Sequence, residues 1–353
     1  MGGGKQRWFR PRARERVSLA RLAWRCSPGL TAATFASTLL AGLLPTVFTI
    51  ASGVVVGALP AVAADGLGSP AGGRVTAGLA VIGVLYLVMQ VVHPFRESAS
   101  RLLMGRIDAD LALRVMDTSA RPAGVAHLED PAILDRILQA QGAITAGTPG
   151  GAAYHLAQVW GRRIVATSSL VVLATFRWWL PVLLVAGHAT AYRWRRRNWR
   201  LLTRVVFGRS EALRRSFYVR QLATEPAAAK ETRVFDLDGW LVDRYRSHFD
   251  EAMGPIWRER RFSGLVALAV SGVIVVLQGV ALLVVVGAGL RGAIALGAVA
   301  VSAGCILASA QLGSFSGDHS DIEDGLASLR VLLELEAART TAAAAADAPG
   351  AGA

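Results

Sequence analysis

Polar residues inside the apolar stretches are the first candidates for chemistry. Four of them stand in long uncharged surroundings: Gln90, His188, Gln278 and Gln311. Polar groups within a membrane tend to face the interior of the helix bundle, so these four are candidates to line a transport pathway. Hydrogen bonding between helices is the simpler role, also for Thr167-Ser168-Ser169. Asp, Glu and Lys are absent from the centres of these stretches, which argues against a proton relay and favours an apolar or amphipathic cargo.

Sequence motifs of enzymes and metal sites are missing. The apolar stretches hold no HExxH, no GxSxG and no paired carboxylates, which disfavours an intramembrane enzyme. Cys26 and Cys305 are isolated, so no disulfide and no metal site is expected. A phosphate-binding GxxxxGK[ST] loop is absent, since Gly2-Gly3-Gly4-Lys5 has the wrong spacing. We expect no cofactor in this chain and no ATPase activity of its own.

The composition is that of a membrane protein. The chain has 353 residues, 53% of them hydrophobic, and a net charge of +13. The basic residues cluster beside uncharged runs, as membrane topology requires, so a nucleic-acid partner is not expected. Residues 1–26 form a basic N-terminal segment, and the apolar run behind it is too long for a signal peptide.

The pattern of charges predicts an all-α membrane protein with six spans between residues 27 and 338. A membrane-spanning helix needs roughly 20 apolar residues. The predicted spans lie at 28–59, 75–92, 164–176, 178–192, 262–290 and 292–317. Pro45 is expected to kink the first span, and the helix of the second is expected to continue beyond Pro94.

The third and fourth spans are short, with 13 and 15 uncharged residues. Arg162 and Arg163 can reach the membrane surface at one end, and Arg177-Trp178-Trp179 predicts an interfacial turn at the other. A single re-entrant hairpin is the alternative for this region.

Charge asymmetry predicts the orientation. The connections placed outside hold only Asp65, Arg74, Arg177 and Arg291, whereas the N-terminal segment and the flank 193–204 are strongly basic. By the positive-inside rule, both termini lie in the cytoplasm, and the protein belongs to the cell membrane. The Ala/Gly-rich tail, 339–353, is expected to be disordered.

Two charged excursions, about 93–163 and 193–261, are predicted to be long cytoplasmic helical arms, each turning at an acidic residue followed by proline. At the first tip, Asp130 would cap a short helix that starts at Pro131. That helix carries an apolar stripe: Ile133, Leu134, Ile137 and Leu138.

At the second tip, Glu225-Pro226 opens a small-residue helix, and Asp238-Gly239 is expected to break it. A further apolar stripe follows: Trp240, Leu241, Tyr245 and Phe249. Periodicity alone favours the view that both tips are turns of a helical bundle.

The words HLEDPAILDRI and AAAKETRVFDLDGWLVDR, with six spans and two arms, resemble the transmembrane domain of a bacterial ATP-binding-cassette exporter, from about residue 30 to 338. The resemblance implies the type-1 exporter fold, a dimer of two such halves, and a partner nucleotide-binding domain that supplies ATP and Mg. It implies that the tips couple to that partner. The residues carried over to this role are Glu129, Asp130, Pro131, Ile133 and Leu134 in the first tip, and Pro226, Lys230, Glu231, Arg233 and Phe235 in the second.

The chain departs from that family because only about 35 residues follow the sixth predicted span, with no ATPase motif. The ATPase would be a separate chain, the sequence would be truncated, or the chain would have become a passive partner. Two functions therefore remain open: the membrane subunit of an exporter, moving a substrate that the sequence does not identify, or a non-transporting membrane scaffold or regulator with the same fold.

Overall fold

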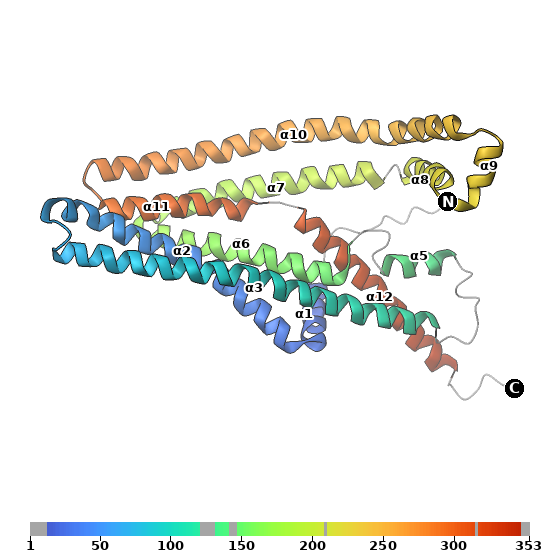
Figure 1. Cartoon of the computed structure of the whole chain (residues 1–353), viewed down its shortest axis with the longest axis horizontal. Helices are drawn as coiled ribbons and strands as arrows, with labels where there is room; N and C mark the ends of the chain where they lie inside the picture. Colours follow the sequence, from blue (N-terminus) through green and yellow to red (C-terminus); the bar gives the residue numbers. More distant parts are fainter. Residues whose placement is uncertain (1–12, 121–130, 141–146, 208–209, 315–316, 347–353) are drawn as a thin grey trace. The chain divides into compact units, whose positions relative to one another are not determined.

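A computed structural model describes residues 13–120, 131–140, 147–207, 210–314 and 317–346 (Figure 1). These residues are almost entirely helical, and none of them forms a β-strand. The chain divides into two compact units. The first comprises Met1–Pro181 and Leu282–Ala353, and the second comprises Val182–Ala281.

The first unit is a bundle of long helices. Its elements are α1 (Ala13–Cys26), α2 (Pro28–Asp65), α3 (Pro70–Ala120), α5 (Pro131–Ala140), α6 (Pro149–Phe176), α11 (Leu296–Ala308), the 3-10 helix η2 (Ser309–Gly313) and α12 (Asp318–Ala346). The helix α2 packs along α3 and contacts α6 and α11, while α12 packs against α6 and α5 (Figure 1). Hydroxyl caps set two of the starts. Ser27 Oγ accepts a hydrogen bond from the Leu30 amide, and Thr148 Oγ1 accepts one from Gly151, each just before a proline at the first helical position.

The second unit contains most of α7 (Trp179–Phe207), then α8 (Ser210–Thr224), η1 (Pro226–Ala228), α9 (Ala229–Val234) and most of α10 (Asp238–Leu290). At 53 residues, α10 is about 80 Å long at a rise of 1.5 Å per residue. Within this unit Arg195 Nη2 of α7 donates a hydrogen bond of 3.0 Å to Ser271 Oγ of α10. The bare backbone of Gly187 faces Leu277, so the two helices approach closely.

Five segments are helical, long and apolar enough to cross a membrane: Pro28–Asp65, Pro70–Ala120, Pro149–Phe176, Gly264–Leu290 and Leu296–Ala338, the last of which contains α11, η2 and part of α12. They identify a multi-pass membrane protein. The predicted fourth span falls on α7, whose uncharged part stops at Tyr192 before a run of arginines, and among the described residues α7 does not reach the length and hydropathy of the other five. A sixth span remains a prediction.

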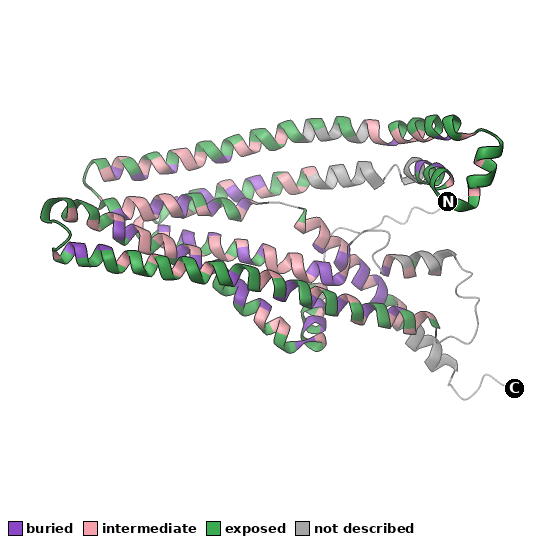
Figure 2. Ribbon diagram, viewed as in Figure 1, coloured by how far each residue is buried: buried purple, intermediate pink, exposed green. Residues whose placement is uncertain are grey.

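Apolar side chains cover the outer faces of these helices. Leu87, Val91, Leu268 and Leu283 are all at least 65% exposed, and much of α3 and α10 is exposed along its length (Figure 2). Water would disfavour so large an apolar surface, whereas lipid chains solvate it.

The best-buried apolar cluster lies beyond the apolar ends of the spans. It joins α1, α3, α5, α6 and α12, and Ile107, Ala152 and Leu326 are at most 1% exposed. Ile107 of α3 and Leu326 of α12 therefore lie in the core of this part of the first unit. The extensions of α3 and α6 beyond the apolar stretches are thus held by a core of their own.

Three glycines let α2 and α11 approach closely inside the apolar region. Gly53 and Gly57 lie one turn apart on α2, and a Cβ atom on Gly297 of α11 would collide with the Gly53 carbonyl oxygen and meet Gly57 Cα at 3.0 Å. Small residues four apart are typical of helix contacts in membranes, because packing replaces the missing hydrophobic driving force.

Several sequence predictions about helix ends are confirmed. Helix α3 runs through Pro94 without ending, and α6 and α7 are separate helices that meet at Arg177 and Trp178. The short helix of the first tip begins at Pro131.

Three predictions were wrong. Asp238-Gly239 opens α10 instead of breaking a helix. The break lies just before it, at Asp236, which has φ 51, a conformation that Asp adopts more readily than most residues. The run 292–317 is not one helix, because α11 gives way to η2 and an extended Ser314. Helix α12 continues to Ala346, so 339–346 are helical, in keeping with the high helix propensity of alanine, while 347–353 lie outside the described residues.

Candidate functional site

The second predicted tip is a short, exposed element that we call the α9 tip, residues 226–235. Glu225 is extended (φ −93, ψ 144) because it precedes a proline, and this separates α8 from η1. No residue of η1 or α9 is buried (Figure 2). Val234 and Phe235 are each 68% exposed. An element of two short turns has little core of its own, so its apolar side chains are available for a partner.

Charged side chains share the α9 tip with these apolar ones. Lys230, Glu231 and Arg233 are all exposed, and within the described part of the chain none of them forms an ion pair. Internally, Thr232 donates a hydrogen bond of 2.8 Å to the Ala228 carbonyl oxygen. The tip therefore presents charges of both signs around exposed Phe235.

The start of α10 extends this exposed apolar surface. Trp240 and Val242 are 59% and 54% exposed, whereas Leu241 between them is buried. Farther along the helix, Tyr245 stacks on Phe249 with ring centroids 5.5 Å apart. The predicted stripe is thus divided, because Leu241 is buried within the unit and Trp240 is exposed beside the tip.

The first predicted tip behaves differently. Glu129 and Asp130 lie outside the described residues, and the side chains of Pro131 and Leu134 are not described. Ile133 is half-buried. Ala140 is buried in the large core cluster and Ile137 packs against it, so α5 is held on α12 of its own chain. At least part of the stripe on this tip is therefore bundle core.

The four polar residues singled out in the apolar stretches do not share one environment. Gln90 is exposed and donates a hydrogen bond of 3.1 Å to Tyr86 on its own helix, and Gln311 is exposed in η2. In the second unit His188 is 1% exposed and Gln278 is half-buried.

The expected hydrogen bonding between helices is confirmed at Ser168 and Ser169. Thr46 Oγ1 of α2 lies 2.7 Å from Ser168 Oγ and 3.2 Å from Ser169 Oγ of α6.

No protein-family model and no curated protein matches this chain.

An ion-pair network that the sequence did not predict joins α6 to the first turn of α12. His155 Nδ1 lies 2.7 Å from Asp318 Oδ1, and Nε2 of the same ring lies 3.3 Å from Asp321 Oδ2. Arg162 pairs with the other oxygen of Asp318. Both ring nitrogens can donate together only when the imidazole is protonated. The only sequence signal was the presence of opposite charges near two predicted span ends.

The same network is the cluster of described residues best suited to a metal ion, since donor atoms of His155, Asp318 and Asp321 lie within 4.8 Å of one another. Asp318, however, is already neutralised by Arg162, and both nitrogens of His155 face carboxylates. The arrangement fits a structural ion-pair network better than a metal site.

Two further polar groups tie α3 to its neighbours. The Asp108 carboxylate accepts hydrogen bonds from the Gly150 amide (2.8 Å) and the Thr148 hydroxyl (2.9 Å), where it binds the start of α6. Arg114 donates two bonds, of 2.8 and 2.7 Å, to Glu336 of α12. These contacts explain how the bundle holds α3, α6 and α12 together beyond their apolar parts.

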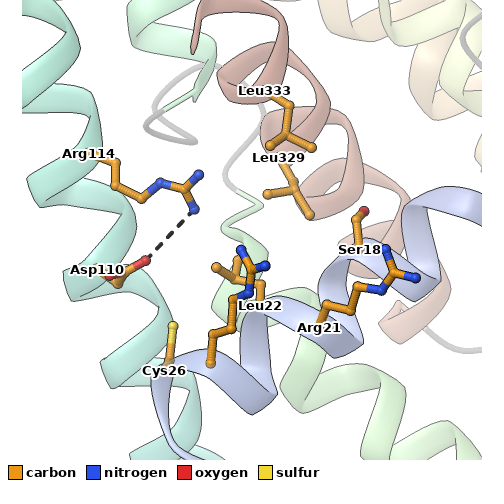
Figure 3. A pocket seen from close by; sticks show the side chains of 9 residues that line it. Ser18, Arg21, Leu22, Cys26, Asp110, Arg114, Leu329 and Leu333 are labelled. Atoms are coloured by element: carbon orange, nitrogen blue, oxygen red, sulfur yellow. Dashed lines mark ion pairs between the residues drawn. The ribbon is translucent and has the colours of Figure 1, made fainter. Parts of the chain in front are cut away.

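A cavity of about 420 Å³ lies between α1, α3 and α12 (Figure 3). Arg21 and Arg25 of α1 line it together with Arg114, whose guanidinium is 3.9 Å from Asp110. Cys26 also lines it. Burial, and next the nearby charge of Asp110 and a hydrogen bond to it, raise the pKa of the Cys26 thiol. A neutral thiol is a poor nucleophile and a poor metal ligand, so the cavity is unsuited to cysteine chemistry.

Proposed function

We propose that this chain is the membrane subunit of an ATP-driven exporter, one half of a dimeric translocation pathway with the type-1 exporter fold. The α9 tip carries the proposal. It is an exposed turn with an aromatic residue and charges of both signs, held between α8 and the long helix α10, and it contributes nothing to a core. Such an element serves to receive a partner, and the proposed partner is a nucleotide-binding domain that hydrolyses ATP.

The remaining parts of the proposal follow from the same assignment. ATP and Mg would be bound by the partner, and both termini and the α9 tip would lie in the cytoplasm of a cell whose plasma membrane holds the protein. Gln90, His188, Gln278 and Gln311 are candidates to line the pathway. The absence of Asp, Glu and Lys from the apolar span cores favours an amphipathic or apolar substrate.

A second function has its own supporting observation. Because α5 is packed on α12 of the same chain, only the α9 tip has no buried residue among the described parts of the two tips. A single docking element among the described parts of the tips suits a non-transporting membrane scaffold or regulator. Transport driven by ATP separates the two functions.

The test is co-purification of an ATPase with the tagged full chain in mild detergent. Wild-type chain should carry MgATP hydrolysis that depends on a second polypeptide. Phe235→Ala should weaken retention of that polypeptide about thirtyfold, since loss of a central aromatic anchor costs roughly 2 kcal/mol. Tyr218→Ala, an exposed aromatic on α8 that is outside the tip, is the control and should retain it.

Two results would contradict the proposal. One is saturable ATP binding by the pure chain after all other polypeptides have been removed. The other is an ATPase partner that Phe235→Ala retains as firmly as the wild type does.

A further inference from the structure

Helix α1 has two faces of different character. One face, Leu19, Leu22 and Ala23, is buried in the core cluster. The opposite face is exposed, and its residues are Arg16, Val17, Ala20, Arg21, Trp24 and Arg25. The helix is thus fixed to the protein along one side and offers basic and aromatic side chains along the other.

The exposed face of α1 forms one wall of a groove whose other wall is α6. We call it the α1–α6 groove; its volume is about 620 Å³, and Leu156 and Trp160 contribute the α6 wall. Trp24 and Trp160 are 57% and 55% exposed. The groove therefore combines an apolar aromatic lining with three arginines, of which Arg21 and Arg25 also line the cavity between α1, α3 and α12.

The described residues that line the groove carry positive charge only. Among the described residues no acidic side chain lines it and none of Arg16, Arg21 and Arg25 forms an ion pair, although Asp110 lines the neighbouring cavity with Arg21 and Arg25. The neighbouring carboxylate, Glu15, is taken by Arg330, whose Nε and Nη2 donate bonds of 3.0 and 2.6 Å to it. Three arginines in one groove without a counter-charge call for an anionic ligand.

Both walls of the groove lie where the chain enters the membrane. Trp24 stands four residues before Pro28, the first residue of α2, and Trp160 stands four residues before the uncharged run that starts at Ile164. Extended Ser27 (φ −162) separates Trp24 from α2, whereas on the continuous helix α6 a rise of 1.5 Å per residue places Trp160 about 6 Å before its apolar stretch. This is the level of the lipid headgroups, where tryptophan is enriched in membrane proteins.

We propose that the α1–α6 groove binds the headgroup of an anionic phospholipid. Arginine binds phosphate oxygens in a planar, two-pronged geometry, and the tryptophans and Val17 offer an apolar surface to the glycerol backbone and the first acyl carbons. A soluble phosphate would use only the arginines. Lipid binding at this site requires no ATPase partner, so its test does not depend on whether the chain transports a substrate.

The test measures lipid binding to the full chain in detergent by native mass spectrometry. Dioleoyl-phosphatidylglycerol is titrated against dioleoyl-phosphatidylcholine and against inorganic phosphate. The wild type should bind phosphatidylglycerol in preference to the other two. The variant R16Q/R21Q/R25Q should bind it roughly a hundredfold more weakly, at about fivefold per arginine, since each basic residue near an anionic membrane contributes about 1 kcal/mol.

A matched control removes the same charge elsewhere. R220Q/R244Q/R246Q replaces three exposed arginines of the second unit, and it should change phosphatidylglycerol binding less than twofold. If the triple variant of α1 fails to fold, Arg16→Gln alone should still lower binding about fivefold. Trp24→Ala should weaken phosphatidylglycerol binding and leave phosphate binding unchanged.

Three outcomes would overturn the proposal. The α1 variant binds phosphatidylglycerol as well as the wild type, the control variant loses as much binding as the α1 variant, or inorganic phosphate binds as tightly as the phospholipid. The last outcome would make the groove a site for a soluble anion.

Discussion

His155 Nδ1 lies 2.7 Å from Asp318 Oδ1, and the two residues are 163 positions apart in the chain. This contact fixes α12 to α6 directly after the break that η2 and Ser314 make in the last apolar run. A movement of α12 away from α6 would break this contact. Its contribution to the free energy of unfolding can be measured by mutation.

Replacing His155 by alanine should lower the free energy of unfolding by about 1 to 3 kcal/mol, because two part-buried carboxylates lose the imidazole that they contact. Chemical unfolding in detergent, followed by circular dichroism, measures the change. His248→Ala is the control, since its contact to Glu251 is only a 4.0 Å approach. Equal losses in the two variants would show that the His155 contacts contribute nothing specific. A double-mutant cycle with Asp318→Asn isolates the pair.

The glycine contact between α2 and α11 predicts a position intolerant of even one methyl group. Gly297→Ala should destabilise the protein by about 1 to 3 kcal/mol, because the Cβ atom has no space against the backbone of Gly53 and Gly57. Gly83→Ala on α3 is the matched control, since nothing lies within 4 Å of a Cβ atom there. Thermal unfolding in the same detergent compares the two, and a Gly297→Ala protein as stable as Gly83→Ala would contradict the close approach.

The two tips should respond in opposite ways to truncation. Ile137→Ala in α5 should cost about 1 to 2 kcal/mol of unfolding free energy, because the side chain packs against the core cluster and is only partly buried. Phe235→Ala should change stability by less than about 0.5 kcal/mol, because Phe235 is exposed. Chemical unfolding curves of the two variants measure both changes. A large loss of unfolding free energy for Phe235→Ala would mean that the α9 tip is part of a core.

Cys26 should alkylate slowly at neutral pH. Because the pKa of the thiol is raised, the reactive thiolate becomes abundant only at a more alkaline pH than for an ordinary cysteine. In a variant that lacks Cys305, the rate of N-ethylmaleimide labelling against pH should therefore be shifted to the alkaline side. Asp110→Asn should move the curve part of the way back, since burial, the larger cause, persists. A pH dependence of labelling that matches that of an unburied cysteine would show that the pKa of Cys26 is not raised.

Membrane orientation can be tested with single cysteines in a background without Cys26 and Cys305. Positions 65 and 291 should react with a membrane-impermeant maleimide in intact cells, and positions 196, 230 and 258 should react only after lysis. The reason is that arginine is in excess in the segments that contain positions 196, 230 and 258, and arginine-rich segments lie in the cytoplasm. Labelling of position 230 from outside, with 65 protected, would reverse the topology.

Much of the membrane architecture was readable in the sequence because it depends on local composition. The lengths of the uncharged runs predicted helices that fit a bilayer, and proline after an acidic residue predicted where the chain turns into α5 and η1. Pro94 was correctly expected not to end α3. These features arise from the cost of burying charge and from backbone constraints, and both are properties of a residue and its immediate neighbours.

Only the tertiary structure decided which face of each helix is buried and which is exposed. The two tips differ, since α5 is packed on α12 while Val234 and Phe235 of the α9 tip are exposed. The break at η2, the pairing of His155 with Asp318, and the exposed face of α1 next to Trp160 likewise have no local signal. Each results from contact between segments far apart in the chain, and the sequence pattern of one segment does not specify which distant segment will lie against it.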